Sequence, residues 1–303
     1  MTPQTSLSSR AWIELVLLGL IWGGSFLAIR TALDEIGPLT SVLHRTGWAM
    51  LVLWGVVALK RLPVPKAPKV WGAFLVMGLL NNVIPFSLMA WGQLYIPTGL
   101  TSIFNAATAV FGIVVASLVF ADERLTARKA LGVGLGFFGV CLAIGLDALR
   151  QFDTTSLAQL AIVAGTLSYA LAGAWARKML GGVPPVIAAA GMLTGSTLCM
   201  IPLVLAVEGT PSLALAPDTW LAIAYYAIVA TALAYLLYYR VLGMAGSGNL
   251  LLVTLIIPPV AITLGALVRN ESLHPGEYLG FAVLALGLSI IDGRLWRRKA
   301  TTV

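Results

Sequence analysis

The chain alternates long apolar segments with short breaks that contain proline, glycine or charged residues. Each apolar segment is long enough for a helix that crosses a bilayer core of about 30 Å, which needs roughly 20 residues. Most segments have no polar face, whereas the helices of a soluble protein would need one. The pattern predicts ten transmembrane helices, at about residues 12–33, 38–60, 70–92, 97–120, 127–146, 157–177, 184–206, 217–241, 246–268 and 275–292.

The fourth and fifth predicted helices share a pattern with the ninth and tenth, 148 residues later. Each copy lies at the junction of two apolar segments, which indicates an internal duplication. We therefore expect two units of five helices each, residues 1–150 and 151–303. The matching positions are Glu123-x-Leu125 with Glu271-x-Leu273, Leu131-Gly132 with Leu279-Gly280, and Gly139 with Gly287.

Because five is an odd number of crossings, the second unit begins on the opposite side of the membrane from the first. The two units are then inverted relative to each other. Inverted repeats are typical of transporters that work by alternating access, with a substrate site near the middle of the membrane. The predicted fold class is an all-α integral membrane protein with ten transmembrane helices in two inverted five-helix repeats.

The composition agrees with a membrane protein, because 59% of residues are hydrophobic and 10% are charged, against about 25% charged in a soluble domain. The two cysteines, Cys141 and Cys199, lie inside apolar segments and indicate neither a disulfide framework nor a metal site. The chain has two histidines, no HExxH or GxSxG motif, and no carboxylate pair at mid-membrane. We expect no catalytic residues, metal or cofactor, and no enzyme activity.

The positions of lysine and arginine predict the orientation. If the N-terminus is cytoplasmic, fifteen of these residues lie on the cytoplasmic side and three on the other, with Arg45 inside a helix. The positive-inside rule then places both termini in the cytoplasm. Topology, including a basic tail from about residue 293, explains the net charge of +7, so no nucleic-acid partner is expected. The first segment lacks a small-residue cleavage site and is expected to be a retained helix, not a signal peptide.

Ionisable residues within the membrane are few. His44 and Arg45 lie about two turns into the second helix, roughly 9–10 Å from its beginning. Arg45 could bind a substrate carboxylate, with His44 beside it, or could extend toward the membrane surface. No Asp or Glu is predicted near mid-membrane, so proton coupling through a buried carboxylate is not expected.

Polar residues in the third and fourth helices are candidates for a substrate site. Thr98, Thr101, Asn105 and Thr108 recur at steps of three, four and three, so they form one stripe on an otherwise apolar helix. The stripe lines a transport cavity or joins helices through hydrogen bonds. Asn82, next to Asn81, lies at a similar depth in the third helix and is a further candidate.

Aromatic residues, glycines and prolines near mid-membrane complete the prediction. Thr231 and Tyr235 share a face of the eighth helix. The alternative role of the aromatic residues is packing with one hydrogen bond. The prolines each remove a backbone hydrogen bond and either act as hinges or only bend their helices. The predicted cavity residues are Trp22, Ser168, Tyr169 and Tyr235, and the predicted hinge or gate positions are Gly23, Gly24, Pro85, Pro258 and Pro259.

The motif E-x-L-x5-L-G-x6-G at the end of each half resembles the EamA-type members of the drug/metabolite transporter superfamily. The segment from Leu20 to Arg30 is similar to the family's opening L-W-G-x-x-F pattern, and Arg45 matches an arginine usual early in the second helix. The resemblance covers essentially the whole chain. It implies a multi-pass secondary transporter of the bacterial inner membrane that exports small neutral metabolites by alternating access. Amino acids, including aromatic ones, are the best-known solutes of such exporters.

Two departures bear on the substrate that the resemblance implies. Trp22 stands where small multidrug exporters carry a membrane-embedded Glu, which counts against a proton-coupled drug carrier. Val110 stands where the family favours proline, while the second copy keeps Pro258. A nucleotide-sugar carrier is the other alternative and would need more buried positive charge. With both halves in one chain, we expect a functional monomer whose partners are a small-molecule substrate and the lipid bilayer.

Overall fold

The computed structural model describes residues 8–145, 154–250 and 252–292, except for the side chains of residues 245–249. All secondary structure in these ranges is helical, which confirms the predicted fold class. The basic tail from residue 293 and Arg150 lie outside these ranges. The elements are α1 (Ser9–Ala32), α2 (Pro38–Leu59), α3 (Pro68–Gly78), η1 (Leu79–Val83), α4 (Ile84–Gly92), α5 (Thr98–Ala106), α6 (Thr108–Val119), α7 (Ala127–Ile144), α9 (Thr154–Met179), α10 (Pro185–Val207), α11 (Pro217–Ala224), η2 (Tyr225–Leu233), α12 (Ala234–Leu250), α13 (Val253–Arg269) and α14 (Pro275–Asp292).

Within the described ranges, nine helical spans are long and apolar enough to cross a membrane, and a tenth apolar helix, α13, is 17 residues long. Five helices begin with proline, which has no N–H to leave unpaired and whose φ is already suited to a helix. Hydroxyl side chains cap the N-termini of two other helices. Ser8 Oγ accepts from the Ala11 N–H at 3.2 Å, and Thr126 Oγ1 accepts from the Lys129 N–H at 3.3 Å. The five prolines are Pro38, Pro68, Pro185, Pro217 and Pro275.

Two spans differ from the prediction. The eighth span continues as α12 to Leu250, so the ninth helix begins at Val253 instead of residue 246. Residues 234–250 contain glycines but no proline, so nothing blocks the backbone hydrogen bonds of the helix. The fourth span was expected to be one helix, but it is broken at Ala107 into α5 and α6.

Spans three and eight each contain a π-helical segment near the middle. These segments are η1, between α3 and α4, and η2, between α11 and α12. A π-helix pairs each N–H with the carbonyl five residues earlier, and such segments occur often at functional sites. Because spans three and eight occupy the same place in the two halves, the repeats share this distortion. The sequence did not predict it.

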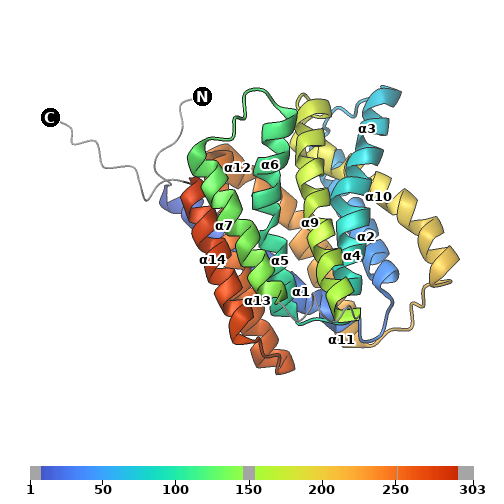
Figure 1. Cartoon of the computed structure of the whole chain (residues 1–303). Coiled ribbons are helices and arrows are strands. Elements are labelled where there is room, and N and C mark those ends of the chain that lie inside the picture. The colour runs from blue at the N-terminus through green and yellow to red at the C-terminus, as the bar shows by residue number, and fades with distance from the viewer. Residues whose placement is uncertain (1–7, 146–153, 251, 293–303) are drawn as a thin grey trace.

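The repeated glycines of the sequence motif pack against each other, where α7 crosses α14 (Figure 1). A Cβ atom on Gly132 would lie 2.6 Å from the Gly287 carbonyl oxygen, and one on Gly139 would lie 2.7 Å from the Gly280 carbonyl oxygen. Residue numbers rise along α7 as they fall along α14, so the two helices are antiparallel. Each is the last helix of its half, and the halves are therefore inverted.

The remaining contacts between the halves follow the same two-fold exchange. Helix α1 packs on α13 as α9 packs on α5 and α6, and α2 packs on η2 as α10 packs on α3. Helices α2 and α10, which correspond to each other, pack together at the edge of the bundle opposite α7 and α14 (Figure 1). The first three spans of each half thus surround a common central region.

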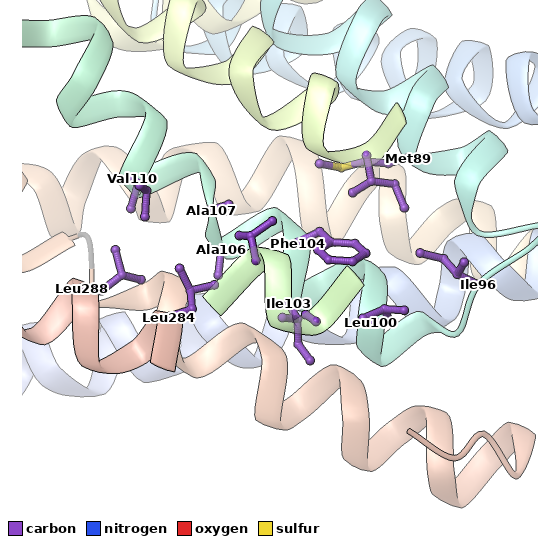
Figure 2. Close-up of a cluster of buried hydrophobic side chains, with 14 of the residues drawn as sticks. Met89, Ile96, Leu100, Ile103, Phe104, Ala106, Ala107, Val110, Leu284 and Leu288 are labelled. Atoms are coloured by element: carbon purple, nitrogen blue, oxygen red, sulfur yellow. The ribbon is translucent and has the colours of Figure 1, made fainter. Parts of the chain in front are cut away.

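A large buried apolar cluster fills the side of the bundle between α5, α6 and α14 (Figure 2). Figure 2 shows Val110 of α6 near Leu284 and Leu288 of α14, with Phe104 and Met89 further along the cluster. Both lipid and these side chains are apolar, so the cluster stabilises the fold through close packing rather than through removal of apolar surface from water.

Carboxylates of one half bind the beginnings of helices in the other at what we call the Asp34 end of the bundle. Glu271 accepts hydrogen bonds from the Thr98 N–H and hydroxyl, both at 2.8 Å, at the start of α5. Glu208 accepts from the N–H groups of Leu39 at 2.9 Å and Thr40 at 2.8 Å, at the start of α2. A carboxylate at a helix N-terminus pairs N–H groups that have no partner within the helix and favourably offsets the helix dipole.

An ion pair joins the two halves at the same end. The Arg269 guanidinium donates to both carboxylate oxygens of Asp34, at 2.8 and 3.1 Å, and Arg30 donates at 2.6 Å. The hydrogen bond from Arg269, supported by Arg30, holds the pKa of Asp34 below its ordinary value. Asp34 therefore stays ionised, and the pair intact, throughout the neutral pH range.

The duplicated glutamates should contribute unequally to stability. At the opposite end of the bundle, the Glu123 side chain is 41% exposed and pairs with Lys129 at 3.2 Å and Arg177 at 3.6 Å. We expect Glu271→Ala to reduce the stability of the protein by about 1–2 kcal/mol, because it removes two charge-assisted hydrogen bonds at a helix start. Glu123→Ala, the matched control, should change it by less than about 0.5 kcal/mol, since exposed ion pairs contribute little. Thermal unfolding in detergent measures both, and equal losses would contradict the assignment.

Candidate functional site

Arg45 lies in the central region, between elements of both halves. Its Nε donates to Thr231 Oγ1 of η2 at 3.0 Å. Its Cζ lies 3.8 Å from the ring centroid of Phe86 on α4, a favourable cation–π distance. The Thr231 hydroxyl donates to the Tyr226 carbonyl oxygen at 2.8 Å, which leaves its lone pairs facing the guanidinium. These contacts hold Arg45 across the bundle and do not let it reach toward the membrane surface.

No carboxylate neutralises Arg45 within the part of the chain that the structure describes, since none of its ion pairs includes this residue. The hydroxyls of Tyr169, Tyr226 and Tyr235 interact electrostatically with the guanidinium. A buried charge without a counter-charge is unfavourable. Arg45 is nevertheless partly accessible, and its contacts with α4 and η2 lie within the bundle. The guanidinium therefore suits an anionic group.

Amide and hydroxyl groups of three spans form a network beside Arg45. Asn81 Nδ2 donates to Asn82 Oδ1 at 3.1 Å and to Tyr235 Oη at 3.2 Å. Asn82 Nδ2 donates to Ser196 Oγ on α10 at 2.8 Å. Asn82 and Ser196 are fully buried, whereas Asn81 and Tyr235 are partly accessible. Close approach of α3 to α10 at Gly78 allows this contact, because a Cβ there would lie 2.7 Å from the Met192 carbonyl oxygen.

The two π-helical segments are each bound by a side chain of the other half. Ser168 Oγ of α9 donates to the Leu80 carbonyl oxygen of η1 at 2.7 Å. Trp22 Nε1 of α1 donates to the Ala230 carbonyl oxygen of η2 at 3.1 Å. Trp22 and Ser168 lie on corresponding helices at almost the same place in the repeat. Donors from the partner half thus pair carbonyl groups where the regular helical pattern is disturbed.

Aromatic rings border the site. Tyr169 packs edge-on against Phe86, with ring centroids 6.3 Å apart. Trp22 packs against Tyr238 at 5.9 Å. These rings belong to both halves, and Trp22, Tyr169 and Tyr238 are partly accessible. The site therefore combines one cation, several hydroxyl and amide groups, and aromatic surface.

The structure brings together six of the predicted residues and leaves others apart. Thr101 of α5 is fully buried, and its hydroxyl donates to the Pro97 carbonyl oxygen at 3.1 Å, within its own helix. Asn105 is partly accessible, and no side chain among the described residues bonds to it. Among the described residues, no hydrogen bond or ion pair links these two to Arg45. The six residues around one centre are Trp22, Arg45, Asn82, Ser168, Tyr169 and Tyr235.

His44 points away from Arg45, as expected for consecutive residues about 100° apart around a helix. Its Nδ1 accepts from Trp48 Nε1 at 3.1 Å, and its ring lies edge-on to Trp220, with centroids 5.6 Å apart. The side chain borders a groove on the surface of α2. His44 and Arg45 therefore do not form a joint anion site here. The groove is lined by Leu43, His44, Gly47, Trp48, Met50 and Leu51.

The predicted hinges lie where helices approach closely. Helix α1 is continuous through Gly23 and Gly24; a Cβ on Gly23 would lie 2.6 Å from Val260, and one on Gly24 would lie 2.6 Å from the Tyr225 hydroxyl. Pro85 is the second residue of α4, which begins where η1 ends, and Pro258 and Pro259 lie inside α13. Their role in gating stays a prediction.

Two residues of the site had no signal in the sequence. Ser196 binds Asn82, and Tyr226 accepts a hydrogen bond from Ser41 at 3.3 Å while its carbonyl holds Thr231. Ser196 lies beside Thr194 and Thr197, and Tyr226 follows Tyr225, so no residue type singled either of them out. Both residues lie in or against the π-helical segments η1 and η2, and neither segment could be predicted from residue types.

Comparison with known proteins shows where the chain belongs. Residues 10–145 and 156–291 each match the EamA-like transporter family. A probable amino-acid metabolite efflux pump of Escherichia coli strain K12 is 24% identical over 96% of this chain and 98% of that protein. A probable terminal-alkyne amino-acid exporter of Streptantibioticus cattleyicolor is 23% identical over 98% of both chains. A solved crystal structure superimposes with a TM-score of 0.67 at 15% identity, over 96% of this chain and 99% of that one, and so shares the fold.

The family match covers both halves, and Arg45, which has no ion-pair partner among the described residues, contacts elements of each half. The protein is a multi-pass membrane transporter, not an enzyme, and belongs to the EamA-like transporter family, with one copy of the family unit in each half.

Proposed function

We propose that the protein exports small neutral metabolites with a carboxylate, in particular α-amino acids including aromatic ones. The observation that carries this proposal is the unpaired guanidinium of Arg45 in the central region. A substrate carboxylate would supply the missing counter-charge and form charge-assisted hydrogen bonds with the planar fork of the arginine.

The surroundings of Arg45 favour a solute with an apolar or aromatic side chain. Phe86 and Tyr169 border the guanidinium, and Trp22 binds the carbonyl of Ala230, the residue before Thr231 in η2. Aromatic pairs of this kind add specific geometry to apolar contact. The relatives in Escherichia coli and Streptantibioticus cattleyicolor carry names that refer to amino-acid efflux or export, which supports the same class of solute.

The alternatives fit the central charge less well. A proton-coupled carrier of cationic drugs would need a carboxylate in the site, and the described residues around Arg45 include none. The nearest buried acid in α1, Glu14, is paired with Arg10 at 3.2 Å and Arg240 at 2.5 Å. A nucleotide-sugar carrier would need several cations for its phosphates, and Arg45 is the single cation among the described residues of this site.

Transport by alternating access requires that each half rock against the other about the central site. The excess of fifteen lysines and arginines over three supports cytoplasmic N- and C-termini in a bacterial inner membrane. The Asp34 end would then face outward. With no carboxylate to carry protons, the substrate's own gradient drives transport. One chain contains both halves, so a monomer suffices.

Uptake into proteoliposomes tests the proposal. We expect the purified protein to give saturable flux of labelled phenylalanine and threonine that is indifferent to a pH gradient, because no buried acid couples proton and solute. Empty liposomes are the control. Flux of a quaternary-ammonium dye alone, driven by the pH gradient, would overturn the proposal in favour of a drug carrier.

A further inference from the structure

The hydrogen-bond direction of the amide network beside Arg45 is set by backbone carbonyls. Ser196 Oγ lies 2.8 Å from the Met192 carbonyl oxygen and 3.3 Å from the Gly78 carbonyl oxygen. Carbonyl oxygens only accept hydrogen bonds, so the Ser196 proton is donated to them and its oxygen must accept from Asn82. The Asn82 amide therefore presents Nδ2 to Ser196, at 2.8 Å, and Oδ1 to the central region.

This direction passes on to Asn81 and Tyr235. Asn82 Oδ1 accepts from Asn81 Nδ2 at 3.1 Å and from the Tyr235 hydroxyl at 3.4 Å. The second hydrogen of Asn81 Nδ2 is directed to Tyr235 Oη at 3.2 Å. Both amide hydrogens of Asn81 and the hydroxyl proton of Tyr235 are thus used within the network.

The network is left with an acceptor at its accessible side. No donor among the described residues reaches Asn81 Oδ1, and this oxygen is not among the enclosed polar atoms. Asn81 is partly accessible, unlike Asn82, which is fully buried. Arg45 supplies the opposite chemistry, because a guanidinium has five donors and no acceptor, and one of them is used on Thr231.

The acceptor and the donors belong to one site. Tyr235 is hydrogen-bonded to Asn81, and it lies four residues after Thr231, which binds Arg45, on the same face of the eighth span. A single phenol thus separates a group that attracts hydrogen-bond donors from one that attracts anions. An α-amino acid has an ammonium donor and a carboxylate acceptor on the same carbon atom, so it matches both.

We infer that Asn81 Oδ1 accepts a hydrogen bond from the α-ammonium group of the substrate while Arg45 binds its α-carboxylate. This inference rests on the proposed function and makes it narrower. Asn81 makes the site selective for zwitterions over carboxylic acids, and Arg45 makes it selective for zwitterions over amines.

The test is competition against labelled phenylalanine uptake in proteoliposomes of the full chain. Unlabelled phenylalanine, 3-phenylpropionate, which lacks the ammonium, and phenethylamine, which lacks the carboxylate, are the competitors. We expect unlabelled phenylalanine to inhibit uptake at a concentration at least about tenfold lower than either analogue requires. Each analogue lacks one charged group and therefore loses a hydrogen bond to the site.

Variants separate recognition from structure. Asn81→Leu, or Asn81→Ala if the leucine does not fit, should weaken inhibition by phenylalanine about tenfold and leave inhibition by 3-phenylpropionate unchanged. Thr197→Val on α10 is the matched control, because the Thr197 hydroxyl donates to the Leu193 carbonyl oxygen within its own helix, and it should leave the ratio of the two unchanged. If Asn81 has only a structural role, its variants will weaken both competitors alike, and the inference is overturned. It is also overturned if the wild-type protein binds 3-phenylpropionate as well as phenylalanine, although carboxylate transport then stands. A protein that moves none of these solutes would refute the proposed function itself.

Discussion

Arg45→Gln should reduce saturable phenylalanine uptake by at least about 30-fold. Removing one partner of a buried charge pair costs about 2–5 kcal/mol, which corresponds to this factor or more. The uptake rate of Arg45→Lys should lie between those of the wild-type protein and Arg45→Gln, because an ammonium keeps the charge but loses the planar fork and the stacking on Phe86. Initial rates over a range of substrate concentrations, in proteoliposomes with matched amounts of protein, measure the effect.

His44→Gln is the matched control for Arg45. It changes the next residue of the same helix, whose ring packs on Trp48 and Trp220 outside the site, and it should change uptake less than about twofold. The stability of the substrate-free protein gives a second readout. Arg45→Gln should leave the melting temperature unchanged or raise it, because it removes a buried charge that has no counter-charge. Normal uptake by Arg45→Gln, or an equal loss in His44→Gln, would refute the assignment.

Gly139→Val should prevent stable folding or lower the stability of the protein by more than about 3 kcal/mol. A Cβ at this position would lie 2.5 Å from the Leu284 backbone nitrogen and 2.7 Å from the Gly280 carbonyl oxygen. Overpacking usually costs about 1–3 kcal/mol when the opposing atoms belong to side chains that can rotate away. Here the opposing atoms are backbone, so α7 and α14 must separate along their crossing.

Gly134→Val tests whether the crossing itself is the cause. Gly134 lies on the same helix, and a Cβ there would meet no atom within 4 Å. We expect this variant to elute as a single species and to unfold within a few degrees of the wild-type protein. Size-exclusion chromatography of detergent-solubilised protein after heating compares the two. Similar losses in both variants would mean that valine harms α7 at any position, and the close crossing would not be the reason.

Much of the site could be proposed from residue types because polar groups are rare in this chain. Arg45 stands out as a charge inside an apolar segment. Asn82, Tyr169 and Tyr235 stand out as polar residues predicted near the middle of the membrane. The prediction could not separate Arg45 from His44, because they are adjacent in sequence. It also grouped Thr101 and Asn105 with the site on periodicity and depth, and the Thr101 hydroxyl bonds within its own helix instead.

By itself, the sequence determined the helical spans, the membrane location and the inverted duplication, because these depend on segment length, apolar content and an odd number of crossings. It also contained the glycines that meet where α7 crosses α14. Only the tertiary structure decided which face of each helix turns inward. Lipid and protein interior are both apolar, so a membrane helix lacks the contrast that orients an amphipathic helix. For the same reason, the π-helical segments and the direction of the Asn81 amide came from packing between the halves, where Ser168, Trp22 and Ser196 bind groups far away in sequence.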